Sequence, residues 1–193
     1  MIFPTFLYAI PNMRKRGEAK NEVHAAKTEA FQWKKSQEVT VRRLRSEEVP
    51  AALALTWEVF QQFEAPEYTQ EGIDFFRASL HDTQRTKELR FYGAFDGTEL
   101  IGTLCMRQPQ HIGGFFVRAA YHRRGIGRAL FQTMQQDYER REFTVNSSPY
   151  AVEVYRHLGF VPTDTEQTVN GLRFTPMCFA EENSKSLLTR EEV

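Results

Sequence analysis

The chain has 193 residues and no formal net charge, because its 25 lysine and arginine side chains match its 25 aspartate and glutamate side chains. With 41% hydrophobic and 26% charged residues it can bury a core, and nothing attracts the whole chain to nucleic acid or to an anionic membrane. Its two cysteines, Cys105 and Cys178, lack the spacing of a zinc site or a disulfide framework.

Residues 1–38 differ in composition from the rest, and we expect a poorly ordered N-terminal extension there. The alternative is an arm that packs on a partner through Phe3, Phe6, Leu7 and Tyr8. The charges of residues 14–16 follow the apolar start, which is the wrong order for a secretory signal. No apolar run is long enough to span a bilayer, so the expected location is cytoplasmic.

A strand and two helices are predicted next. Residues 39–44 alternate and are rich in β-formers, which indicates a strand. Ser46 is a candidate N-cap for a helix that ends near Gln62, and Thr69 is a candidate N-cap for a second helix. Their apolar faces consist of Ala52, Thr56, Val59, Phe60 and Phe63 in the first helix, and of Ile73, Phe76 and Leu80 in the second.

Three strands are expected over residues 90–95, 99–106 and 112–117. The first two are joined by Asp96-Gly97, a strong signal for a tight hairpin. These strands therefore form an antiparallel meander.

The stretch Phe115–Arg128 combines the end of a strand, a basic turn and the start of an amphipathic helix. Free N–H groups and the helix dipole concentrate partial positive charge at such a turn. Gly125 and Gly127 let the backbone approach a ligand without interference from Cβ atoms. The stretch predicts a binding site for a phosphate or pyrophosphate. Its added positive charge comes from Arg123, Arg124 and Arg128.

The helix after this turn is followed by a buried strand at residues 143–145 and by a helix with Ser148 as its predicted N-cap. Residues 161–179 form a final hairpin that turns at Asn170-Gly171. The inward side chains are Ile126, Leu130, Met134 and Tyr138 in the first of these helices, and Ala151, Val154, Tyr155 and Leu158 in the second.

The element order is βααβββαβαββ, with antiparallel strands first and helix-separated strands later. This order predicts an α+β fold, in which a mixed sheet carries helices on both faces. We expect residues 39–180 to form one domain, followed by a polar C-terminal tail at residues 181–193.

Two motifs follow one another on the later elements. His122–Gly127 matches Q/R-x-x-G-x-G/A, although His122 stands where glutamine or arginine is usual. A second pattern, Asn…Ala-x-x-x-Tyr-x-x-x-Gly-Phe, follows it. Together these motifs resemble the GNAT (GCN5-related N-acetyltransferase) family of acyl-CoA-dependent N-acyltransferases, over residues 39–179. The second pattern falls on Asn146, Ala151, Tyr155, Gly159 and Phe160.

The resemblance implies the acyl-CoA N-acyltransferase fold, an α/β/α sandwich. Its mostly antiparallel sheet of about seven strands is splayed between the fourth and fifth. Acetyl-CoA would be the co-substrate, without a metal, and its pantetheine arm would pair with residues 115–117. Gly113 and Gly114 would mark a bulge or a close approach there, or only a fit beneath a helix. The implied coenzyme-binding residues are Phe115, Phe116, Val117, His122, Arg123, Arg124, Gly125, Ile126, Gly127, Arg128 and Asn146.

His122 would weaken coenzyme binding or make it pH-dependent near neutrality; the alternative is a side chain that faces solvent beside the turn. Asn146 would bond the coenzyme or order water, and its alternative role is helix capping.

The implied reaction is direct attack of a primary amine on acetyl-CoA in a ternary complex, with Tyr155 as general acid. Helical spacing alone would make Tyr155 a core aromatic. The fourth strand lacks the glutamate that serves many relatives as base. Glu64 is the candidate base; Glu67, His111 and a water chain remain alternatives.

The resemblance places the acceptor pocket at Phe60, Phe63 and Tyr68, beside Glu64 and the loop of the last hairpin. Aromatic rings with a carboxylate suit a cationic amine, carried by a small molecule or a protein. A homodimer is a possible assembly, and neither nucleic acid nor membrane is expected as a partner. The rival function is a catalytically silent acyl-CoA-binding sensor or assembly module of the same fold.

Overall fold

The computed structural model describes residues 38–107, 110–139 and 141–180. The expectations for the N-terminal extension, except at residue 38, and for the tail at residues 181–193 lie outside the described residues. Within the described ranges, no helix has the length and apolar character needed to cross a membrane. The helices are α1 (Val49–Phe63), α2 (Gln70–His81), α3 (Thr83–Lys87), α4 (Ile126–Gln135) and α5 (Val152–His157). The strands are β1 (Val39–Arg43), β2 (Arg90–Asp96), β3 (Glu99–Arg107), β4 (His111–Val117), β5 (Glu142–Ser147), β6 (Val161–Pro162), β7 (Gln167–Val169) and β8 (Leu172–Ala180).

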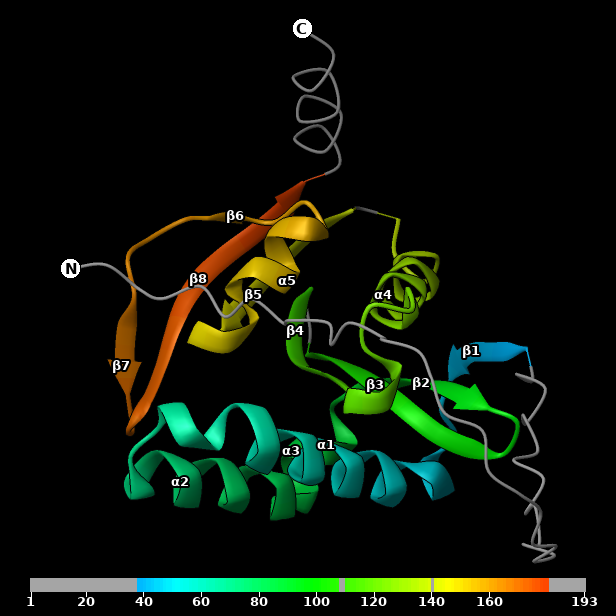
Figure 1. The fold of residues 1–193 in the computed structure, drawn as a ribbon, viewed down its shortest axis with the longest axis horizontal. Coiled ribbons are helices and arrows are strands. Elements are labelled where there is room, and N and C mark those ends of the chain that lie inside the picture. Colours follow the sequence, from blue (N-terminus) through cyan, green and yellow to red (C-terminus); the bar gives the residue numbers. More distant parts are fainter. Residues whose placement is uncertain (1–37, 108–109, 140, 181–193) are drawn as a thin grey trace, which may run out of the picture. The chain divides into compact units, whose positions relative to one another are not determined.

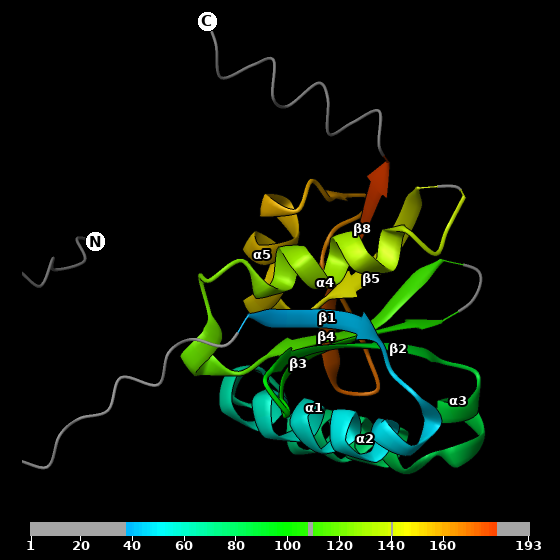
Figure 2. The same cartoon turned by 90° about the vertical axis from the view of Figure 1, so that its right-hand side faces the viewer.

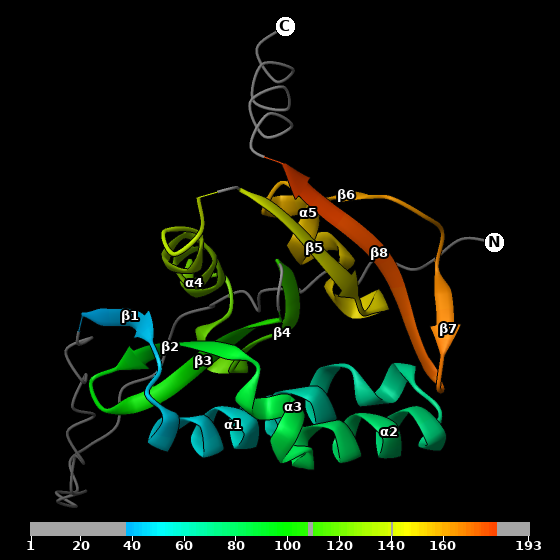
Figure 3. The same ribbon diagram turned by 180° about the vertical axis from the view of Figure 1, so that it is seen from behind.

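The strands form one path in the order β1-β2-β3-β4-β5-β8-β6, and β7 pairs with β8 (Figure 1). The neighbours along this path are antiparallel except β4 and β5, which are parallel. These two strands pair only where His111 meets Thr144 and Ile112 meets Val145. Beyond these positions they diverge, as Figure 3 shows from behind. The predicted mixed sheet with a splay between its fourth and fifth strands is confirmed.

Helices cover both faces of this sheet (Figure 2). α4 and α5 lie on one face, and α4 packs on β1, β2 and β3. α1, α2 and α3 lie on the other face, where α1 packs on β3 and β4. α1 and α4 each have an apolar stripe, and burial of that stripe stabilises the packing of the helix on the sheet. The buried stripes are Ile126, Leu130, Phe131 and Met134 in α4, and Ala52, Leu55, Thr56, Val59 and Phe60 in α1.

β4 contains the bulge that was one of the expectations for its glycines. Cys105 pairs with Gly114 while Met106 pairs with Ile112, so Gly113 is an extra residue on β4. A Cβ atom on Gly114 would lie 3.2 Å from the sulfur of Cys105 and from the Phe116 ring. The bulge therefore bends β4 directly after Ile112, the last residue of this strand that pairs with β5.

Two predicted caps differ in the structure. Ser46 is not an N-cap, because a 3₁₀ turn (Ser46–Glu48) precedes α1 and the Glu48 carboxylate accepts from the Arg45 backbone N–H at 2.9 Å. Ser148 occupies an N-cap position, but its hydroxyl makes no capping hydrogen bond. In contrast, the Thr69 hydroxyl accepts from the Gly72 backbone N–H at 3.3 Å, which confirms that cap.

Three further differences concern an additional helix, a divided strand and an exposed side chain. α3 is an additional short helix, whose N-terminal cap is the Asp82 carboxylate accepting from the Arg85 backbone N–H at 3.0 Å. Residues 161–169 form two short strands instead of one, because the Asp164 carboxylate bonds the Thr165 backbone and turns the chain. Val154 is 48% exposed, so its predicted inward position is wrong.

Candidate functional site

Two cavities meet where β4 and β5 separate. The large cavity, about 480 Å³, lies between the α1–α3 layer and the ends of β3, β4 and β8. The small cavity, about 420 Å³, lies between the end of α1, the end of β4, the start of α5 and the turn at residues 122–125 that precedes α4, which we call the glycine turn. Because the same side chains form part of both walls, the two cavities adjoin. The shared residues are Glu64, Phe115, Phe116, Ala151 and Tyr155.

The glycine turn forms one end of the small cavity. Gly125 has φ +79° and directly precedes α4, whose first N–H groups have no intrahelical partner. Arg123 also has positive φ, at 59°. The turn therefore presents backbone donors and the positive end of a helix dipole to the cavity, as an anionic ligand requires.

Most of the predicted coenzyme-binding residues line the small cavity. Arg124 and Arg128 do not, and the Arg124 guanidinium lies 5.0 Å from the centre of the Tyr121 ring. Asn146 lines the large cavity instead. The residues on the small cavity wall are Phe115, Phe116, Val117, His122, Arg123, Gly125, Ile126 and Gly127.

His122 is partly buried and contacts both the end of β4 and the end of α1 from the glycine turn. Its Nε2 donates to the Val117 carbonyl over 2.7 Å, which places the proton on Nε2 because a carbonyl only accepts. Its ring lies 5.1 Å from the Phe63 ring. The side chain thus links the end of β4 to the turn and to α1, and the interpretation as a solvent-facing residue is wrong.

Replacing Gly125 by alanine should lower the free energy of unfolding by about 1–2 kcal/mol, the cost of a left-handed backbone for an L-residue. An added Cβ would meet nothing within 4 Å, so the backbone alone causes the loss. Urea denaturation measures the effect. Gly127→Ala is the control, since Gly127 lies in the first turn of α4 without a positive φ and its added Cβ would meet only the Phe115 ring, at 3.3 Å. Equal stability of Gly125→Ala and the unmodified protein would contradict this account.

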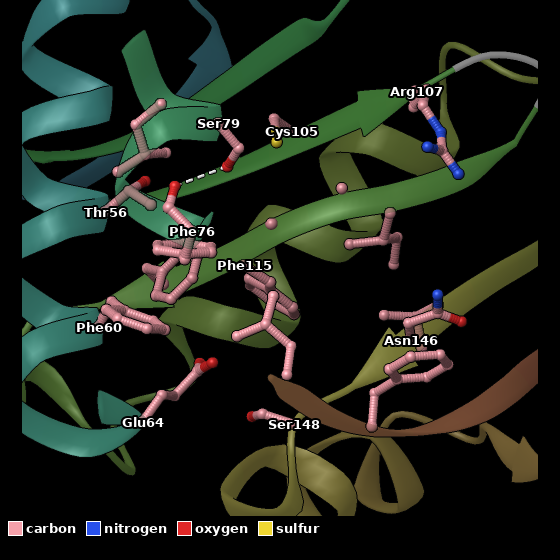
Figure 4. Close-up of a pocket in the computed structure, with 18 of the residues that line it drawn as sticks. Thr56, Phe60, Glu64, Phe76, Ser79, Cys105, Arg107, Phe115, Asn146 and Ser148 are labelled. Atoms are coloured by element: carbon pink, nitrogen blue, oxygen red, sulfur yellow. Dashed lines mark hydrogen bonds between the residues drawn. The ribbon is translucent and has the colours of Figure 1, made fainter. Parts of the chain in front are cut away.

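Glu64 ends α1 and points into the large cavity, as Figure 4 shows. Burial raises the pKa of its carboxyl to about 7, while the nearby Ser148 hydroxyl opposes part of the rise. Ser148 Oγ is itself buried and has no hydrogen-bond partner among the described residues. A carboxyl group with this pKa can gain and lose a proton near neutrality.

The other candidate bases have less suitable surroundings. Glu67 is exposed, lines neither cavity and lies 3.9 Å from Arg173. His111 lines the large cavity, and its Nδ1 lies 2.9 Å from the Thr144 hydroxyl. Burial, then the charges of Arg107 and Arg85, lower the pKa of His111 to about 4. Such an imidazole is neutral at pH 7 but is a weak base.

Tyr155 stands at the junction of the cavities and is 5% exposed. Its ring packs edge-on against Phe115 and Phe160, with centroids 6.0 and 5.2 Å away. Its hydroxyl has no hydrogen bond to any residue that the structure describes. Burial, and next the charge of Glu64, raise the pKa of this phenol above its ordinary value. Tyr155 therefore remains protonated at neutral pH while its ring belongs to the core.

The predicted acceptor residues divide between the cavities. Phe60 and Tyr68 line the large cavity, where the Phe60 ring stacks 4.0 Å from that of Phe76. The Tyr68 hydroxyl donates to the Arg173 carbonyl over 3.1 Å and ties this wall to β8. Phe63 lines the small cavity instead.

Sequence patterns missed several side chains of the walls. Arg85 and Arg107 line the large cavity, but α3 is too short to give an apolar stripe that would have located Arg85. Four large apolar side chains of the described residues are exposed, and all four border a cavity. Phe75 and Val169 border the large one, and Tyr150 and Val154 the small one.

Comparison with known proteins adds a family and a fold. A family model described as an acetyltransferase (GNAT) domain matches residues 64–180. No curated protein matches the sequence. A GCN5-related N-acetyltransferase structure from Rhodopseudomonas palustris superposes with a TM-score of 0.64 at 19% identity, covering 75% of this chain and 97% of that one.

Two further solved structures share the fold. The PaiA N-acetyltransferase from Thermoplasma acidophilum, solved in complex with coenzyme A, gives a TM-score of 0.59 at 18% identity, covering 75% of this chain and 99% of that one. An acyl-CoA N-acyltransferase from Pseudomonas aeruginosa gives 0.54 at 19% identity, covering 75% and 100%. At these identities the likeness shows the fold.

Proposed function

The chain belongs to the family of GNAT acetyltransferase domains, and from that premise we propose that it transfers an acetyl group from acetyl-CoA to a primary amine by direct attack within a ternary complex. The observation that carries this proposal is the junction of two cavities at Glu64 and Tyr155. One cavity ends at an anion-binding turn, the other is open to a second substrate, and a base and an acid stand between them. The amine belongs to a small molecule or a protein.

The residues around the small cavity suit acetyl-CoA. The turn from Arg123 to Gly127 would hold the pyrophosphate on backbone donors, with Arg124 and Arg128 adding charge outside the wall. The end of β4, which no longer pairs with β5, would offer the backbone of Phe115 and Phe116 to the pantetheine arm, whereas the Val117 carbonyl already accepts from His122. His122 would keep this strand end against the turn through its bond to Val117. Asn146 would order water at the large cavity.

The proposed domain extends over residues 39–180, beyond the stretch that the family model matches. β1 pairs with β2 along all of its length, from Val39 with Asp96 to Arg43 with Tyr92. α1 carries Phe60 and ends at Phe63, and Glu64 is its C-cap residue, so part of the candidate site lies on this helix and its end.

Acetyl transfer needs a neutral amine and a proton for the departing thiolate. Glu64 would take the proton from the attacking amine as the new C–N bond forms. Tyr155 would give its proton to the sulfur as the C–S bond breaks. The two steps support one another: the Glu64 charge raises the Tyr155 pKa, so protonation of Glu64 removes that contribution and makes the phenol a better acid.

The test is acetyl-CoA turnover by the purified full chain against a panel of primary amines. Release of free thiol together with an acetylated amine identified by mass supports the proposal. Saturable binding of acetyl-CoA without product from any amine favours the silent sensor instead.

A further inference from the structure

The large cavity has charges of opposite sign at its two ends. Glu64 lies at the end shared with the small cavity, and Arg85 and Arg107 come from α3 and from the end of β3. In Figure 4, Glu64 and Arg107 are on opposite sides of the pocket, with Phe76 and Phe115 between them. The cavity therefore has a carboxylate end, an aromatic middle and a guanidinium end.

Among the described residues, no carboxylate pairs with the guanidinium group of Arg85 or of Arg107, by an ion pair or by a hydrogen bond. Arg173, which also lines the cavity, is different, because it pairs with Glu166 at 2.8 Å and lies 3.9 Å from Glu67. The positive charge of Arg85 and Arg107 is thus available to a ligand.

Apart from Glu64, the described residues that line the large cavity include no carboxylate; Asp82, whose carboxylate accepts from the Arg85 backbone N–H, lies outside this wall. The charges of the two arginines help to lower the pKa of His111, after its burial, so this imidazole is neutral at pH 7. Asn146, on the Arg107 side of Figure 4, is uncharged. A polyamine or an aminoglycoside would bring further positive charge to this end, which makes such acceptors unfavourable.

We propose that the acceptor is an amine with a carboxylate at the opposite end of an apolar or aromatic body. The amino group lies at Glu64, the body against Phe76 and Phe115, and the carboxylate accepts hydrogen bonds from Arg85 and Arg107. Guanidinium groups suit this role because their planar N–H pairs match the two carboxylate oxygens. This inference rests on the proposed function, since it takes Glu64 as the position of the reacting amine.

The test compares three acceptors of one shape: para-aminomethylbenzoate, its methyl ester and para-methylbenzylamine. We expect kcat/KM for the carboxylate to exceed that of the two amines without a carboxylate by about tenfold or more, the usual value of a charge-assisted hydrogen bond. Arg107→Gln and Arg85→Gln should reduce that advantage and leave kcat/KM for the methyl ester and for para-methylbenzylamine nearly unchanged. Lys87→Gln is the control, because Lys87 is on the same helix as Arg85 but outside the cavity wall.

The inference is overturned if kcat/KM for the two amines without a carboxylate equals or exceeds that for the carboxylate. It is also overturned if the arginine variants lower kcat/KM for all three acceptors alike. Calorimetric binding of para-methylbenzoate in the presence of coenzyme A tests it without catalysis. If no amine is acetylated but this ligand binds and the arginine variants lose it, the proposed function fails while the carboxylate site stands. Absence of binding together with absence of a carboxylate preference refutes the site.

Discussion

Replacing Tyr155 by phenylalanine should lower kcat about a hundredfold or more, the usual contribution of a general acid, and leave the affinity for acetyl-CoA nearly unchanged. The ring would keep its contacts with Phe115 and Phe160, so the core is preserved and only the proton donor is lost. Steady-state kinetics, with coenzyme binding measured separately by calorimetry, gives both quantities.

The matched control is Tyr138→Phe. The Tyr138 hydroxyl is also buried, has no hydrogen-bond partner among the described residues and lies outside both cavity walls. This variant should keep the turnover of the unmodified protein. Unchanged turnover in Tyr155→Phe would remove Tyr155 from the mechanism, and equal losses in the two variants would indicate damage to the fold.

The second large effect concerns Glu64 and pH. Because burial raises the pKa of its carboxyl to about 7, the basic form is scarce below that pH and predominates above it. We therefore expect kcat/KM to rise with pH through about 7. Glu64→Gln should lower kcat/KM about a hundredfold or more and abolish this limb of the profile. A pH–rate series for both proteins measures the change.

Glu67→Gln is the control for this experiment, since Glu67 is close in sequence but exposed and outside the cavities. This variant should keep the kcat/KM of the unmodified protein and its rise with pH through about 7. Persistence of the limb in Glu64→Gln would assign it to another group, such as the amine itself. Loss of rate with an unchanged profile would mean that Glu64 only shapes the cavity.

Local signals were sufficient for most of the fold. Asp96-Gly97 and Asn170-Gly171 predicted hairpins because both turns need positive φ, which Gly97, Asn170 and Gly171 adopt. The Thr69 cap, the apolar stripe of α1 and that of α4 up to Met134 were also correct, since each depends on residues close in sequence, whereas Tyr138 lies beyond the end of α4. The prediction of Ser46 as an N-cap was wrong, because the Arg42 guanidinium, which lies outside the local capping pattern, pairs with the Glu48 carboxylate at 2.7 Å.

The sequence by itself determined the order of elements except α3 and the division between β6 and β7, the glycine turn before α4, and the family to which the chain belongs, because these depend on periodicity and on short motifs. Only the tertiary structure decided how the charged groups combine. It brought Glu64 beside Tyr155, left Glu67 outside, and gathered Arg85 and Arg107 at the far end of one cavity. These residues come from separate helices and strands, and burial and pairing of charges arise only when such elements meet in space.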